Sequence, residues 1–95
     1  NYIVSIYFFY TPIKRWFLHV PLIFRSYMET KSIGLKIKLL RELRGYSQEE
    51  LASRVDLSYQ QIQKYEYGES KITIERLSSI AQALDCSIFE LLTLD

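Results

Sequence analysis

Two short sequence patterns of the same kind constrain this chain more than any other feature. They are Ser47 with Glu50, and Ser58 with Gln61. A serine followed three residues later by glutamate or glutamine is a capping box: the hydroxyl accepts a helix amide, and the longer side chain returns to the serine amide. We therefore expect one helix to begin directly after each serine, with room between the two helices for only a short turn.

The two predicted helices must pack closely against each other. Gly68 supplies the left-handed residue that ends the second one. Helices joined by so short a turn cross steeply and bury the residues that they share. Ala52 is small enough for the backbones to approach at the crossing. The apolar residues expected to fill the angle are Leu51, Val55, Leu57 and Ile62.

Three further helices are predicted around this pair. From Ser32 to Gly45 the apolar residues recur at three- and four-residue steps, which is typical of a helix. Its predicted inward residues are Ile33, Ile37, Leu40 and Leu43. Thr73 can cap a fourth helix, which ends at Asp85 and Cys86. Its predicted inward stripe is Ile74, Leu77, Ile80, Ala81 and Leu84.

A third capping box, Ser87 with Glu90, predicts a short fifth helix in which Ile88 and Leu91 complete the core. The expected fold is therefore an all-α domain of five helices.

The runs LRELRGYSQEELASRV, LSYQQIQKYEYGE and ALDCSIFELL resemble the DNA-binding domain of phage repressor and Cro-type (XRE family) regulators, over residues 33–92. The motif positions that carry the resemblance are Gln48, Ala52, Asp56, Leu57 and Ile62. The resemblance implies a lambda-repressor-like fold with the helix-turn-helix at helices 2 and 3. Asp56 stands where the family usually has glycine, but aspartate tolerates a left-handed turn better than most residues.

The resemblance also implies which residues contact DNA. In the family, the first two residues of the recognition helix and one residue a turn later contact bases in the major groove. Here these are Tyr59, Gln60 and Lys64. Gln60 can pair with adenine N6 and N7, Lys64 can donate to guanine O6 and N7, and the Tyr59 ring can contact a thymine methyl.

Further residues are expected to support this helix. The predicted DNA-backbone contacts are Arg41, Gln48, Ser58, Gln63 and Lys71. Arg41 and Glu66 match family positions that form an ion pair supporting helix 3. Separately, the spacing of Tyr65 from Ile62 predicts that the Tyr65 side chain lies in the core. Family members bind two-fold symmetric sites as dimers. We expect the homodimer surface near the fifth helix, at Phe89, Leu92 and Leu94.

Residues 1–27 differ in composition from the rest of the chain. They hold nine of the 14 aromatic residues, three basic residues and no acidic residue, which leaves nine basic and eleven acidic residues for the remainder. That remainder, with a net charge of −2, favours a dimer over a tight monomeric DNA binder. We expect Met28 to be the natural start, with residues 28–95 forming the DNA-binding domain and the aromatic-rich residues 1–27 lying outside it.

Residues 1–27 could form a membrane span, a signal peptide, or a strand or hairpin. A membrane span needs about 20 apolar residues, but Pro12, Lys14 and Arg15 interrupt the apolar runs. A signal peptide needs a basic start and a small-residue cleavage site, which are both missing. The segment YIVSIYFFY has the β propensity of a strand or hairpin.

The expected function is a sequence-specific, DNA-binding transcriptional regulator, a repressor, that is cytoplasmic and uses no cofactor and no small-molecule substrate. The alternatives are an antitoxin-like or adaptor module that binds protein, a restriction-modification controller, and a membrane-associated regulator. An enzyme is not expected, because the sequence has no paired acids in a pocket-forming context, no nucleophile with a base and no Gly-rich phosphate loop. Cys86 is the single cysteine, which excludes an internal disulfide, and no ligand spacing indicates zinc. Neither His19 nor Cys86 has an expected role.

Overall fold

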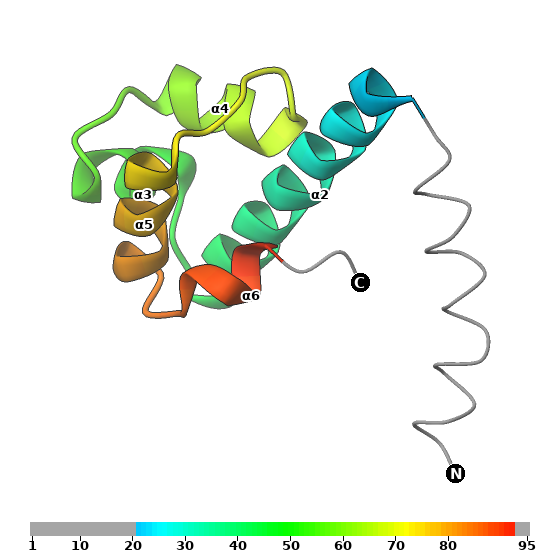
Figure 1. Ribbon diagram of the computed structural model, residues 1–95. Coiled ribbons are helices and arrows are strands. Elements are labelled where there is room, and N and C mark those ends of the chain that lie inside the picture. Colours follow the sequence, from blue (N-terminus) through cyan, green and yellow to red (C-terminus); the bar gives the residue numbers. More distant parts are fainter. Residues whose placement is uncertain (1–20, 93–95) are drawn as a thin grey trace, which may run out of the picture.

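The computed structural model describes residues 21–92 of the 95-residue chain. This part contains five helices and no strand (Figure 1). The helices are α2 (Leu22–Leu43), α3 (Gln48–Arg54), α4 (Tyr59–Tyr67), α5 (Ile74–Ala83) and α6 (Ile88–Leu92). The predicted five-helix, all-α fold is confirmed, whereas the strand or hairpin considered for YIVSIYFFY lies outside the described residues.

Side-chain caps start the middle helices where the sequence predicts them. At Ser47 the capping box is complete: its Oγ accepts from the Glu50 amide at 3.0 Å, and its amide donates to Glu50 Oε1 at 3.1 Å. The second box is only half formed. Ser58 Oγ accepts from the Gln61 amide at 3.2 Å, but the Gln61 side chain donates to Ser70 Oγ at 3.4 Å instead of returning to Ser58.

The predicted caps of α5 and α6 are also present. Thr73 Oγ1 accepts from the Arg76 amide at 3.2 Å. Ser87 donates its amide to Glu90 Oε2 at 2.7 Å, while its hydroxyl accepts from the Phe89 amide at 3.1 Å.

Four helices end through the same backbone arrangement, in which an amide beyond the helix returns to a carbonyl of the last turn. The bonds join Tyr46 to Arg41, Leu57 to Ala52, Glu69 to Lys64 and Cys86 to Ala81, at 2.9–3.1 Å. In each case the preceding residue is left-handed, and these residues are Gly45, Asp56, Gly68 and Asp85, with φ between 54° and 75°. Aspartate thus takes the place of glycine at two of the four ends.

One hydrophobic core joins all five helices. Its fully buried side chains are Ile37, Leu51, Ile62, Leu77, Ile80, Leu84 and Leu91. Two residues that were predicted to point inward do not: Leu43 is 68% exposed and Ile74 is 66% exposed. Leu43 lies in the last turn of α2 and Ile74 in the first turn of α5, where each helix extends beyond the core.

The first helix begins ten residues before its predicted start at Ser32. Its N-cap is Pro21, which makes no side-chain cap bond, so no capping residue marks this end. Met28, the expected start of the functional domain, lies within α2. None of the helices in the described part has both the length and the apolarity that a membrane crossing needs.

Candidate nucleic-acid interface

α3, a short turn and α4 form the predicted pair of crossing helices (Figure 1). Asp56 adopts a φ of 56° in the turn, which is the left-handed conformation that the position requires. Leu51, Ala52 and Ile62 are buried in the angle between the two helices, and Val55 and Leu57 pack against them. The residues predicted to hold this angle therefore do so.

The two sides of α4 differ in character. Ile62, Tyr65 and Glu66 face the interior, in agreement with the core position predicted for Tyr65. The three predicted base-contacting residues are all exposed, and they are Tyr59, Gln60 and Lys64. We call these three the contact face. Their exposure leaves their polar groups and the Tyr59 ring accessible to a partner, whereas a base could not reach the opposite side of the helix.

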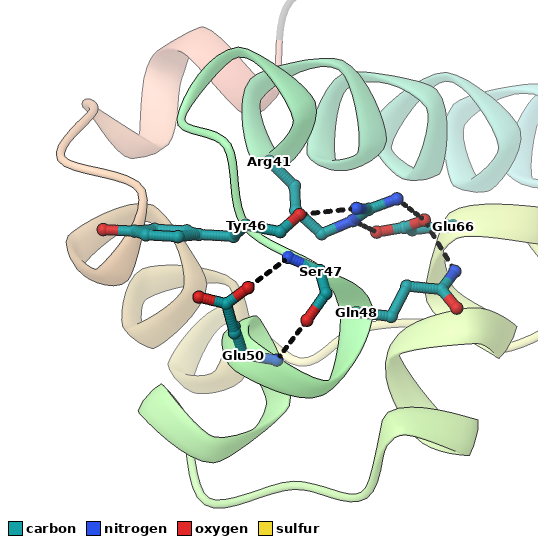
Figure 2. Close-up of polar contacts among 6 residues, drawn as sticks. All are labelled: Arg41, Tyr46, Ser47, Gln48, Glu50 and Glu66. Atoms are coloured by element: carbon teal, nitrogen blue, oxygen red, sulfur yellow. Dashed lines mark hydrogen bonds and ion pairs between the residues drawn. The ribbon is translucent and has the colours of Figure 1, made fainter.

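A charge network joins Glu66, on the interior side of α4, to α2 and α3 (Figure 2). Arg41 Nε lies 2.6 Å from Glu66 Oε2 and Arg41 Nη2 lies 3.1 Å from Oε1, so the predicted ion pair is present and bidentate. Arg41 Nη1 also donates to the Tyr46 carbonyl at 2.7 Å, and Gln48 Nε2 donates to Glu66 Oε1 at 3.0 Å. The network therefore joins α2, α3 and α4 at one carboxylate.

This network changes the role expected of Arg41. Arg41 is only 8% exposed, and all three of its guanidinium nitrogens donate within the protein. The hydrogen bonds that Arg41 donates to Glu66 are the main cause that raises the pKa of Arg41, against the opposing effect of burial. In this conformation Arg41 does not offer a free guanidinium to a phosphate; it supports α4 and, through Glu66, holds Gln48.

The other predicted backbone contacts come from α3, α4 and the loop that follows α4. Gln48 is half-buried, and its bond to Glu66 uses one of its two amide N–H groups. Ser58 is exposed at the start of α4, and Gln63 is half-buried on α4. Lys71 is exposed in the α4–α5 loop, which comprises residues 68–73.

The sequence analysis missed Gly34. A Cβ added there would lie 2.2 Å from the Tyr65 carbonyl oxygen and 2.8 Å from that of Glu66, so the backbones of α2 and α4 touch at this residue. A signal was available, because glycine inside a helix costs about 1 kcal/mol relative to alanine and needs a packing reason.

The predicted dimer surface is partly described. Phe89 is 72% exposed and Leu92 is 40% exposed on α6, whereas Leu94 lies outside the described residues. Their neighbour Leu91 is fully buried. α6 therefore carries apolar side chains on its inner side and also among its exposed residues.

The described residues include no cluster of His, Cys, Asp or Glu side chains that could hold a metal ion. Cys86 is a free cysteine, and burial raises the pKa of its thiol.

Comparison with known families and proteins was consistent with this geometry. The family model described as "Helix-turn-helix" matches residues 37–91. An uncharacterized HTH-type transcriptional regulator from Rickettsia conorii is 46% identical over 56 residues, covering 59% of this chain and 45% of that protein. An uncharacterized transcriptional regulator in the ATPase CF(0) region of Rhodospirillum rubrum is 44% identical over 52 residues, covering 55% of this chain and 48% of that protein. The chain thus spans less than half the length of these curated relatives.

Solved structures share the same architecture. The restriction-modification controller protein C.AhdI from Aeromonas hydrophila superposes with a TM-score of 0.66 at 29% identity, covering 68% of this chain and 94% of that chain. An HTH_3 family transcriptional regulator from Vibrio cholerae gives a TM-score of 0.66 at 32% identity, covering 70% of this chain and 37% of that chain.

Proposed function

Because this chain belongs to the repressor/Cro-type (XRE) helix-turn-helix family, we propose that it is a transcriptional regulator that binds double-stranded DNA sequence-specifically, with α4 in the major groove. The observation that carries the proposal is the division of α4 into a buried side and the exposed contact face. A polar outer side is typical of any amphipathic surface helix, but its place as the second helix of a helix-turn-helix motif favours contact with DNA.

Each residue of the contact face has a defined base chemistry. Gln60 donates to N7 and accepts from N6 of adenine, and Lys64 donates to O6 and N7 of guanine. Tyr59 has one hydroxyl and an apolar ring for a thymine methyl. A good bidentate pair discriminates between bases by about 1–3 kcal/mol, so these residues are sufficient to prefer a short sequence.

Contacts to the DNA backbone set the register of α4. We assign them to Gln48, Ser58, Gln63 and Lys71, which are exposed or half-buried. Gln48 keeps one amide N–H for a phosphate oxygen while Glu66 fixes its orientation. Arg41 contributes indirectly by holding Glu66.

The regulator acts as a homodimer through the outer side of α6. Exposed Phe89 and Leu92 form the centre of this surface, and Leu94 continues it in sequence. Two copies present two α4 helices to half-sites about one helical turn apart. Binding in this way over a promoter would repress transcription.

A second candidate function rests on the similarity to a restriction-modification controller protein. A restriction-modification controller would bind DNA through the same α4 helix. This second function therefore differs from the first proposed function only in the genes that are controlled. An antitoxin-like or adaptor function is different in kind, because protein binding through α6 would need no contact with DNA.

Titration of random-sequence duplex DNA with the chain at increasing salt separates DNA binding from an adaptor role. A DNA-binding protein shows an affinity that falls linearly on a log–log plot against salt, with a slope of about −0.9 for each phosphate neutralised. The matched variant is Lys71→Ala, which removes a proposed phosphate contact and should lower the magnitude of the slope, and the control is Gln82→Ala on the exposed side of α5. The absence of any salt-dependent binding by the unmodified chain would contradict the proposal.

A further inference from the structure

Lys31 lies across the C-terminal end of α4. A Cβ added at Gly68 would lie 2.7 Å from Lys31 Cδ and 3.0 Å from Lys31 Cα, so the lysine stem and backbone cover this glycine directly. The Lys31 ammonium also donates to the carbonyl of Tyr67. That carbonyl belongs to the last turn of α4, where carbonyl groups lack partners within the helix and a positive charge is favourable.

The chain leaves α4 at this point and enters the α4–α5 loop, which carries Lys71. Gly68 is left-handed with a φ of 71°, and the Glu69 amide returns to the Lys64 carbonyl at 2.9 Å. Beyond this turn, the Gln61 side chain donates to Ser70 Oγ at 3.4 Å, and Ile72 packs against the core. The first step of the loop out of α4 is made at Gly68, which lies against Lys31.

The first turns of α2 extend along the same loop. Leu22, Ile23 and Thr30 form one wall of an open hollow of about 480 Å³, and residues 68–71 form the other. Figure 1 shows the C-terminal end of α4 against the N-terminal half of α2. The residues of α2 that make these contacts were not predicted to take part in DNA recognition.

We propose that Lys31 is a positioning residue for DNA binding: it fixes the exit of the chain from α4 and thereby the place of Lys71 beside the contact face. The inference rests on the proposed function, because Lys71 matters only if the loop meets a phosphate. Without Lys31 the loop samples more conformations, and ordering it on DNA costs conformational entropy that the unmodified chain does not lose.

A double-mutant cycle on duplex DNA tests this role with Lys31→Met and Lys71→Ala. Lys31→Met keeps most of the stem and removes the charge and the donor. We expect each single variant to weaken binding by roughly three- to tenfold, and the double variant to be no weaker than the weaker single. Lys31→Arg, which keeps a charged donor, should recover most of the affinity. Multiplying effects would overturn the proposal, because Lys31 would then contribute independently of Lys71, and so would an unchanged affinity in Lys31→Met.

Amide hydrogen exchange tests the same inference without DNA and under conditions where urea titration shows both proteins to be folded. Lys31→Met should speed exchange at Glu69, whose amide closes α4, and leave exchange unchanged at Cys86, whose amide closes α5 in the same way. Equal exchange at Glu69 in both proteins would overturn the positioning role while leaving the proposed function standing. Faster exchange at Glu69 in a chain that binds no DNA would instead overturn the proposed function and, with it, the consequence for Lys71.

Discussion

At the scale of single residues, Glu66 is the group that joins the helices of the candidate interface. Its carboxylate is almost fully buried and accepts two bonds from Arg41 and one from Gln48. Removing one partner of a buried ion pair leaves the other charge without compensation in the interior. Folding raises the pKa of Arg41, so the stability that its charged form contributes is fully present at any pH below the pKa of arginine in the unfolded chain. This stability is lost only as the pH rises above that pKa. Arg41 therefore stays charged throughout the neutral range.

We expect Glu66→Ala to lower the free energy of unfolding by about 3–5 kcal/mol, because Arg41 would remain buried and unpaired. Such a loss is a large part of the stability of an ordinary small domain. Urea titration followed by circular dichroism measures it. The double variant Arg41→Met, Glu66→Leu removes both charges and should recover part of the loss. If Glu66→Ala changed the free energy of unfolding by less than about 0.5 kcal/mol, as a substitution at an ordinary surface site does, the ion pair would not contribute to stability.

The backbone conformation of Asp56 predicts a reversal of the usual helix preference. At this left-handed residue, Asp56→Gly should be more stable than Asp56→Ala by about 1 kcal/mol, because a Cβ is unfavourable at positive φ. At exposed Ser53 inside α3, the same two substitutions should rank in the opposite order by a similar amount. Thermal unfolding of the four variants measures both differences, and the same order at both positions would refute the turn conformation.

At the scale of elements, the backbones of α2 and α4 touch where the two helices cross at Gly34. Gly34→Ala should lower the free energy of unfolding by about 1–3 kcal/mol, although alanine is the better helix former, because two backbone carbonyls would have to move away. DNA affinity should fall too, since Tyr65 and Glu66 belong to α4, the helix that carries the contact face. Ser53→Ala, at an exposed helix position, is the control. Unfolding of Gly34→Ala at an unchanged or higher urea concentration would contradict the crossing.

The elements that the sequence predicted are those with local signals. Ser47, Ser58, Thr73 and Ser87 mark the starts of four helices, because a cap is formed by residues within one turn. The start of α2 at Leu22 was not predicted, because Pro21 gives no capping bond. Here the pattern of apolar residues was the only guide.

The parts of the site that depend on neighbouring elements were harder to predict. The Arg41–Glu66 pair was expected only because the chain resembles a family, since 25 residues separate the two partners. Its inward orientation, the bond from Gln48 and the contacts of Gly34 and Lys31 depend on how α2 crosses α4. No short-range pattern contains that crossing.

At the scale of the whole molecule, the proposed dimer would compensate for weak electrostatics. The residues after Tyr27 carry a formal net charge of −2, which is unfavourable for a protein that must approach phosphates alone. Two copies double the number of phosphate contacts and give the recognition of a two-fold symmetric site.

We expect Phe89→Asp to convert the dimer into a monomer and to weaken operator binding by more than roughly tenfold, because the second half-site would no longer be held. Ile74→Asp is the matched control, since Ile74 is similarly exposed but lies on α5. Sedimentation velocity at high protein concentration measures the state of each variant. If the unmodified chain sediments only as a monomer, with and without operator DNA, the dimer surface on α6 is wrong.

The central claim is that the exposed side of α4 selects a DNA sequence, and selection of bound duplexes from a random pool tests it most directly. The unmodified chain should enrich a two-fold symmetric sequence with half-sites about one helical turn apart. Gln60→Ala should relax the preference at one base position in each half-site and leave the other positions unchanged. If the unmodified chain enriched no sequence, or if Gln60→Ala left every position as selective as before, the assignment of the contact face would be contradicted.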